Sequence, residues 1–134
     1  MSNVAVMKLA GLEKAGDLHG ECLRPGYNGW IDVMDISYGV GRPFGALTPI
    51  GTNLTSFIFS KKLDILSARI SQLCASGQVV PRVTICLLDD KTRRVIRKLE
   101  CTDVLVSSYS CQSAKQGYPT ELVGMSARSA KMVL

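Results

Sequence analysis

Most of the chain alternates between apolar and polar residues with a period of two, which is the pattern of β-strands that bury one face. Residues 82–87 alternate in this way, and the polar residues 89–92 that follow predict a turn. Residues 93–100 then run back with the same alternation, so we expect a β-hairpin. Residues 104–110 and 121–127 are predicted as further strands.

Residues 30–40 also have the composition of a strand, but their alternation slips. Ile31 and Val33 lie on one face, whereas the apolar side chains from Met34 onward lie on the other. A β-bulge, or burial of both faces, explains such a slip. Because a small domain must cover a second apolar face with something, the sequence favours either a helix from the same chain or another copy of the protein.

One stretch, residues 64–76, has the period of a helix. Its apolar residues recur at the spacing of one helical face, Asp64 or Ser67 is a candidate N-cap, and Gly77 is a typical C-terminal stop. The apolar face consists of Leu66, Ile70, Leu73 and Cys74. Many strands and one short helix predict a mainly β fold: a compact β-barrel or two-sheet sandwich of short antiparallel strands, flanked by one α-helix over about residues 64–76.

Residues 39–53 contain four glycines and two prolines and few charges, so they are predicted to form a long loop. Loops of that length usually have a function. The chain shows no internal repeat and no low-complexity linker, and its 134 residues fit one domain, which we expect to span residues 1–134.

The net charge of the chain does not by itself identify the class of binding partner. The 16 Lys and Arg residues outnumber the 11 Asp and Glu residues, giving a formal charge of +5. Such a balance suits nucleic acid, anionic lipid or an acidic partner. The basic residues are scattered, however, and are dense only at residues 61–62 and 93–98. One Trp, four Tyr and three Phe are few for a base-stacking platform. We therefore expect no nucleic acid, and keep a small basic β-barrel that binds nucleic acid as the alternative.

No motif points to an enzyme, a metal or a cofactor. The five cysteines contain no C-x-x-C pair, so we expect free thiols that pack as small hydrophobic side chains. His19 and Glu21 match half of a zinc deaminase signature, but its P-C-x-x-C half is missing. The glycines from Gly39 to Gly45 do not fit the dinucleotide fingerprint, and no phosphate-binding Gly-Lys-Ser/Thr occurs.

The N-terminus lacks the charge and apolar run of a cleavable signal peptide, and no 18 apolar residues are consecutive. We therefore expect the protein to start in the cytoplasm, not to insert into a membrane, and to use for any export a route without a cleavable leader. With catalysis disfavoured and strands that carry apolar residues on both faces, self-assembly is the leading interpretation of the residues.

Several blocks, taken together and in order, resemble the Hcp family, the haemolysin-coregulated tube proteins of bacterial type VI secretion. They cover roughly residues 6–125. The blocks are Gly20-Glu21, residues 29–33 (GWIDV), 59–64 (FSKKLD), 74–77 (CASG), 103–110 (DVLVSSYS) and 119–121 (PTE).

The resemblance implies a β-barrel subunit without an active site or cofactor. Six copies would close into a ring, rings would stack into a hollow tube inside a contractile sheath, and contraction would expel the tube with its spike. The tube would leave the cell by the type VI system and carry small effectors in its lumen. The resemblance also places an extended assembly loop at residues 39–53, where the candidate assembly residues are Gly39, Gly41, Phe44, Gly45, Ile50, Gly51 and Asn53.

The C-terminal segment departs from the family. Related proteins usually close with a strand that carries aromatic residues, whereas residues 124–134 are small, basic and without aromatics. We therefore expect a last strand that is shorter or packed differently.

Overall fold

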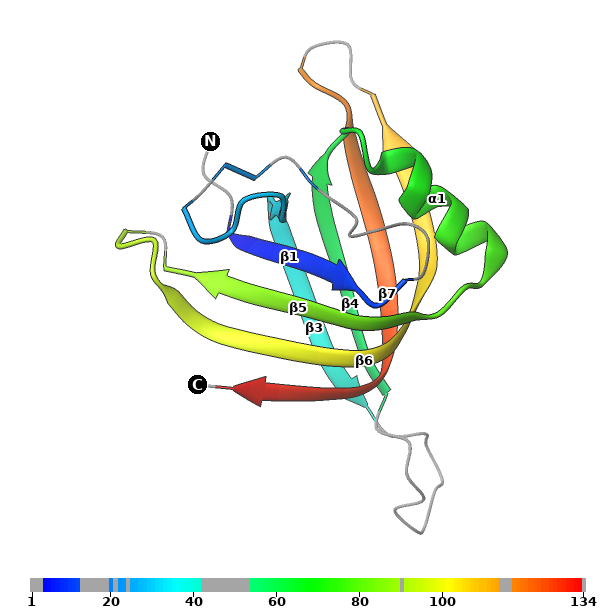
Figure 1. Cartoon of the computed structure of the whole chain (residues 1–134). Coiled ribbons are helices and arrows are strands. Elements are labelled where there is room, and N and C mark those ends of the chain that lie inside the picture. Colours follow the sequence, from blue (N-terminus) through cyan, green and yellow to red (C-terminus); the bar gives the residue numbers. More distant parts are fainter. Residues whose placement is uncertain are drawn as a thin grey trace, which may run out of the picture.

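The computed structural model describes residues 4–12, 20, 22–23, 25–41, 54–89, 91–113 and 117–133. Within them, the chain forms seven strands and one helix (Figure 1). In chain order these are β1 (Ala5–Ala10), β2 (Ile31–Val33), β3 (Asp35–Gly41), β4 (Leu54–Lys62), α1 (Ser67–Ser76), β5 (Val80–Leu88), β6 (Val95–Gln112) and β7 (Thr120–Val133). The strands form one antiparallel sheet in the order β2-β1-β5-β6-β7-β4-β3 that nearly closes into a barrel, so the predicted fold class is confirmed.

β6 and β7 are long and bend, so they run through both walls of the barrel (Figure 1). The first half of β6 pairs with β5 and with the second half of β7, and the second half of β6 pairs with the first half of β7. The front layer is thus β2, β1, β5 and the near halves of β6 and β7. The back layer is β3, β4 and the remaining halves.

The bend lies on a line across three strands. Val80, Val104 and Ala127 form one row of core residues, and Val83, Cys101 and Ala130 form the next, three residues further along each strand instead of two. Asp103, between the two rows, has a φ of 51°. This slip in alternation separates residues 93–100 from 104–110 in the sequence, and the structure shows that both segments, from Val95 onward, belong to one 18-residue strand.

The slip at Met34 has a similar cause. β2 pairs with β1 and β3 pairs with β4, while the Met34 N–H donates to the Ser60 carbonyl at 2.8 Å. The chain therefore turns from the front layer into the back layer at Met34, and the predicted single strand is two strands. β3 extends to Gly41, so the prediction of a loop from Gly39 is wrong for its first three residues.

α1 begins three residues later than predicted, because Asp64 and Ser67 form a turn instead of capping the helix. The Asp64 N–H donates to Ser67 Oγ, and the Leu66 N–H donates to Asp64 Oδ1, both at 2.9 Å. The N-cap is Leu66, without a side-chain cap. The C-terminal stop is confirmed: Gly77 has a φ of 70° and its N–H donates to the Leu73 carbonyl.

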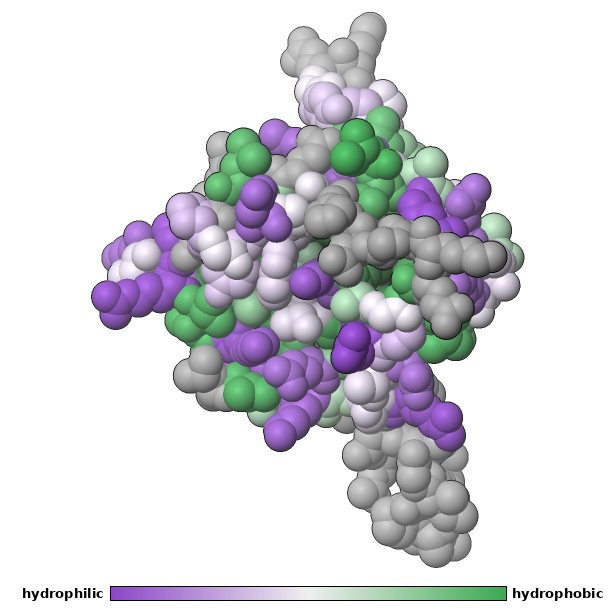
Figure 2. Space-filling view, viewed as in Figure 1, coloured by the Kyte–Doolittle hydropathy of each residue, from purple (hydrophilic) through white to green (hydrophobic). Residues whose placement is uncertain are grey.

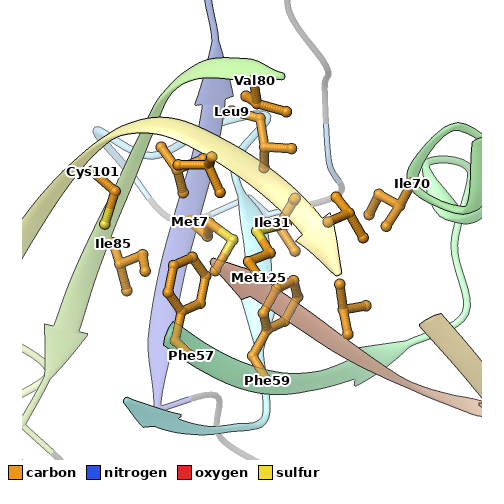
Figure 3. Close-up of a cluster of buried hydrophobic side chains, with 14 of the residues drawn as sticks. Met7, Leu9, Ile31, Phe57, Phe59, Ile70, Val80, Ile85, Cys101 and Met125 are labelled. Atoms are coloured by element: carbon orange, nitrogen blue, oxygen red, sulfur yellow. The ribbon is translucent and has the colours of Figure 1, made fainter. Parts of the chain in front are cut away.

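The main core lies between the two layers and under α1 (Figure 3). The rings of Phe57 and Phe59 project from β4 toward Met7 and Met125, with 6.4 Å between the ring centroids. The predicted helix face also contributes: Leu66, Ile70 and Leu73 are buried and Cys74 packs against them.

A second, smaller cluster covers the outer face of β1 and β5. Val6, Cys86 and Leu88 pack there with Cys22, and Tyr27 and Trp30 lie against them. Both faces of β1 are therefore buried within the chain. At this place the molecule covers its surplus apolar face without a second copy.

Two further predictions concern the hairpin between β5 and β6 and the last strand, β7. The hairpin between β5 and β6 is confirmed, and Asp89 Oδ1 accepts from the N–H groups of Lys91 and Thr92 at its turn. This end of the hairpin projects as a hydrophilic surface at the left of Figure 2. The last strand, β7, continues to Val133, with residues 129–133 paired with β6, and the expectation that it is shorter or packed differently than in the family stays a prediction.

Candidate assembly surface

The back layer consists of four strands, and within the described part of the chain both of its edges are open. β5 ends its pairing with β6 at Val80 and Val104, so residues 105–112 of β6 pair with β7 on one side only. At the opposite side of the layer, β3 pairs with β4, and no other described strand pairs with it. Open edges present unpaired backbone N–H and C=O groups, which favours pairing with another chain.

The outward face of this layer is neutral and made of small residues. It exposes three aliphatic side chains among them: Ile58 (51% exposed), Leu122 (51%) and Leu105 (40%). Asp35, which accepts from Ser60 Oγ, and Lys62 are the charged residues at its described outward positions. The small residues in register around them are Ser37, Gly39, Ser56, Ser60, Ser108, Ser110, Gly124 and Ser126.

The inward face of the same layer carries a buried ionic cluster. Lys61 Nζ lies 2.7 Å from Glu121 Oε1 and 2.7 Å from Asp64 Oδ1, and it also donates to the Lys62 carbonyl. Ser67 Oγ hydrogen-bonds Glu121 Oε1, so the first turn of α1 is tied to β4 and β7. Glu121 Oε2 has no hydrogen-bond partner among the described residues.

The cluster affects its neighbour Tyr109. Burial, together with the nearby Glu121 carboxylate, raises the pKa of this phenol above its usual range. Tyr109 therefore stays neutral, and it packs against the core where α1 covers β6. The cluster is thus a structural device that fixes the helix on the barrel.

The prediction of free thiols is confirmed, but packing as small hydrophobic side chains does not hold for Cys111. All five are free; Cys22, Cys86 and Cys101 are buried, and Cys111 is exposed. Burial raises the pKa of Cys86, and it raises that of Cys101 to about 11. Because the thiolate is the reactive form, these two groups are poor nucleophiles at neutral pH.

In the part of the chain that the structure describes, no three His, Cys, Asp or Glu side chains group as they would around a metal ion. His19 falls outside that part. The expectation of no cofactor, no metal and no catalytic site stays a prediction. No helix among the described residues is both long and apolar enough to cross a membrane.

The predicted assembly residues divide into two groups. Gly39 and Gly41 belong to the open-edge strand β3, and a Cβ added at Gly39 would meet nothing within 4 Å. The others lie outside the described residues: Phe44, Gly45, Ile50, Gly51 and Asn53. The neutral face was not predicted from the sequence, although the serines at 56 and 60 and at 108 and 110, each in phase along its strand, were a signal for it.

Comparison with known proteins gives one family. A family model described as "Type VI secretion system effector, Hcp" matches residues 6–133. None of the curated protein sequences compared with the chain matches it.

Solved structures with the same fold carry related names. Hcp1 from Salmonella typhimurium matches with a TM-score of 0.81 and 20% identity, covering 98% of this chain and 86% of that one. Hcp1 from the E. coli EAEC 042 pathovar gives 0.79 and 17%, with 96% and 89% covered. The secreted protein Hcp3 from Pseudomonas aeruginosa gives 0.75 and 13%, with 98% and 90% covered. At these identities the likeness shows a shared fold.

Proposed function

Because this chain belongs to the Hcp family of type VI secretion proteins, we propose that it is the subunit of the inner tube, and that six copies close into a ring. Rings stack into a hollow tube that sheath contraction expels together with the spike protein. The whole chain, residues 1–134, acts as one domain. It starts in the cytoplasm, leaves through the type VI system without a cleavable signal peptide, and has a structural role without catalysis.

The proposed ring is supported mainly by the two open edges on opposite sides of the back layer. A closed ring uses a heterologous interface, in which one surface of a subunit fits a different surface of the next. The edge of β3 in one copy can pair with residues 105–112 of β6 in the next. Because the layer has four antiparallel strands, its two edge strands run in opposite directions. The new pair is therefore also antiparallel, and the sheet continues around the ring.

Strand spacing sets the size of the hole. Six such layers at about 4.8 Å per strand give a circumference of about 115 Å and a diameter of about 37 Å. A compact chain of this length has a radius of gyration of about 14 Å, so six bodies do not fit inside that circle. The core and front layer must then lie outside, and the neutral face around Ile58 and Leu122 lines the lumen.

A lumen of this kind suits the carriage of small effectors. Serines and glycines leave room and offer hydroxyl groups, while the few aliphatic side chains offer weak apolar contact. Fixed charges are sparse at its described positions, so a passing protein of either sign meets little electrostatic hindrance.

Proline substitutions in β3 test the ring. Successive N–H groups of a strand point to opposite sides, so one of Ser37→Pro and Tyr38→Pro removes a donor of the open edge, and the other removes a donor to β4. The variant that stays folded by circular dichroism is expected to be monomeric in native mass spectrometry, where the unmodified protein gives hexamers. Hexamers from the folded proline variant would contradict pairing through β3.

A further inference from the structure

The back layer has two ends with different surfaces. β4 runs from Leu54 at one end to Lys62 at the other, and β7 runs beside it from Ala127 to Thr120. We call the first end the loop end, because the chain between Gly41 and Leu54 leaves and returns there, and the second the turn end, where β6 connects to β7. Nine residues of β4 separate the two ends by about 30 Å.

The loop end carries a groove of about 470 Å³. Its lining is mostly apolar, with Val79 44% exposed and Leu105 40% exposed. It lies at the line where the sheet bends, beside Asp103 with its φ of 51°, and it begins where β5 leaves the edge of β6. The full lining is Val79, Asp103, Leu105, Ser126, Ala127 and Arg128.

The turn end carries two strongly exposed apolar side chains, Ile65 (75% exposed) and Tyr118 (61%). Their segments lie side by side, because the Leu63 N–H donates to the Pro119 carbonyl at 3.0 Å. Hydrophobic surface is visible near this end, at the top of Figure 2. Lys62 is exposed at the same end of β4. The described chain covers neither apolar side chain.

We propose that the groove at the loop end receives Tyr118 from the turn end of a subunit in the next ring. This inference rests on the proposed tube: rings that stack in one direction bring the loop end of each against the turn end of the next. An aromatic ring fills an apolar groove at low entropic cost, and its hydroxyl remains at the polar rim. Pro119 restricts the segment that presents it.

The groove carries one charge of each sign, Asp103 and Arg128, and Lys62 lies on the strand end beside the segment of Tyr118. Lys62 would be attracted to Asp103 and repelled by Arg128. A facing Lys62 and Asp103 would fix the rotational position of one ring on the next, since complementary charges set register more than affinity. The contact repeats six times around each ring, so a small loss per subunit becomes a large loss per ring.

Two substitutions and two controls test the contact. Tyr118→Ser removes the inserted ring, and Val79→Lys places a charge in the groove, in the turn before β5. Tyr118→Phe keeps the ring, and Leu23→Ser removes a more exposed apolar side chain (85%) next to Cys22, which belongs to the cluster on β1 and β5. Native mass spectrometry counts subunits per ring, and sedimentation with negative-stain imaging measures stacked rings.

We expect hexamers in all four variants, with stacked rings reduced about tenfold or more in Tyr118→Ser and Val79→Lys only. Undiminished stacks in those two variants would overturn the contact and leave the ring intact. Loss of the hexamer in Tyr118→Ser would also overturn it, by placing Tyr118 within the ring. If the unmodified protein forms no ring, the proposed function fails together with this inference.

Disulfide cross-linking tests which group occupies the groove at the loop end. A protein with Leu105→Cys and Tyr118→Cys, in a Cys111→Ser background, is oxidised and separated on a denaturing gel without reductant. Bonds between successive rings give a ladder that continues beyond six subunits, whereas bonds within a ring stop at six. A ladder that ends at or before six, or no ladder, would show that the groove takes something other than Tyr118 of the next ring.

Discussion

At the residue scale, the most consequential group is the buried cluster around Lys61. The ammonium faces two carboxylates, Glu121 and Asp64, in a site where Lys61 and Glu121 are each 1% exposed. A buried ion pair adds little net stability compared with an apolar pair of the same shape, but removal of one partner leaves a charge without compensation. The cluster therefore makes the position of α1 depend on specific side chains.

We expect Lys61→Met to lower the free energy of unfolding by about 3–5 kcal/mol, because it leaves the Glu121 carboxylate buried and unpaired. The double variant with Lys61→Met and Glu121→Leu should recover most of the loss, since the fully buried pair is gone. The remaining carboxylate, Asp64, is less deeply buried and keeps the hydrogen bond from the Leu66 N–H. Urea unfolding of the two variants and the unmodified protein measures the difference. Equal losses in the single and double variants would show that the pair is not coupled.

Sequence patterns contained a partial signal for this pair. Phe57, Phe59 and Lys61 alternate on the buried face of one strand, and Glu121 is in phase with the buried Val123 on another. Two opposite charges at buried positions suggest a pair. Pairing itself depends on the register of strands 60 residues apart in the chain, which local patterns do not fix.

The Cys101 thiol makes stability sensitive to alkaline pH. Burial raises its pKa to about 11, so folding favours the protonated form. The stabilisation is complete below the ordinary thiol pKa and is lost as pH rises from about 9 toward 11, because only the unfolded chain ionises in that window. We expect the stability advantage of the native protein over Cys101→Ala to shrink between pH 8 and pH 10.5 in urea unfolding. A constant difference across this range would contradict a raised pKa.

At the element scale, local patterns predicted the helix and five strand segments but missed β1 and β4. The bend within β6 was interpreted as a break between two strands, and the corner at Met34 as a slip within one strand. The slip at Met34 and the slip at residues 101–104 look alike in sequence. In the structure the first is a corner between two strands, and the second is a bend within one. The distinction depends on which neighbours each half pairs with, so it could not be made from alternation alone.

The C-terminal end of α1 depends on the backbone conformation of one residue, so a substitution there should change the free energy of unfolding through that residue alone. Gly77 adopts a left-handed φ of 70°, and a Cβ there would meet nothing within 4 Å. Gly77→Ala should therefore cost about 1 kcal/mol of stability through backbone strain alone. Gly39→Ala is the matched control, because that site is equally open and has no left-handed φ. Chemical denaturation of both variants should show a loss for Gly77→Ala only; equal stabilities would exclude the strain.

At the scale of the whole molecule, charge opposes stacking. Six copies at +5 each give +30 per ring, so neighbouring rings repel unless their contacts offset the repulsion. Added salt screens this repulsion over about 10 Å at 0.1 M. We expect stacks to lengthen as salt rises, as measured by sedimentation across a salt series. Tubes that are longest at low salt would show that attraction between charges dominates the ring contact.

The loop between β3 and β4 provides a second test at this scale. Because Gly39 and Gly41 belong to β3, a deletion should be confined to residues 43–52. We expect the shortened protein to fold and to form rings, with fewer stacked rings by negative-stain imaging. Undiminished tubes would assign stacking to the described ends of the back layer alone.

The order of the strands in the sheet was beyond prediction from patterns, although the family resemblance implied a barrel. The period-two pattern shows which residues of a strand share a face. It does not show which strand extends beyond the strand it pairs with. The open edge of β6 exists because β5 begins only at Val80, opposite Val104, while β6 continues to Gln112. Long-range pairing of this kind decides where a second copy can attach.

The bent strands have a mechanical consequence. β6 and β7 each pass through both walls of the subunit, so the walls are joined by the covalent chain as well as by packed side chains. If the proposed tube is expelled as a unit, friction on its outer wall and drag on its inner wall would load the subunit in shear. Because the backbone of β6 and β7 is continuous from one wall to the other, the two walls cannot slide past each other without breaking or unfolding these strands.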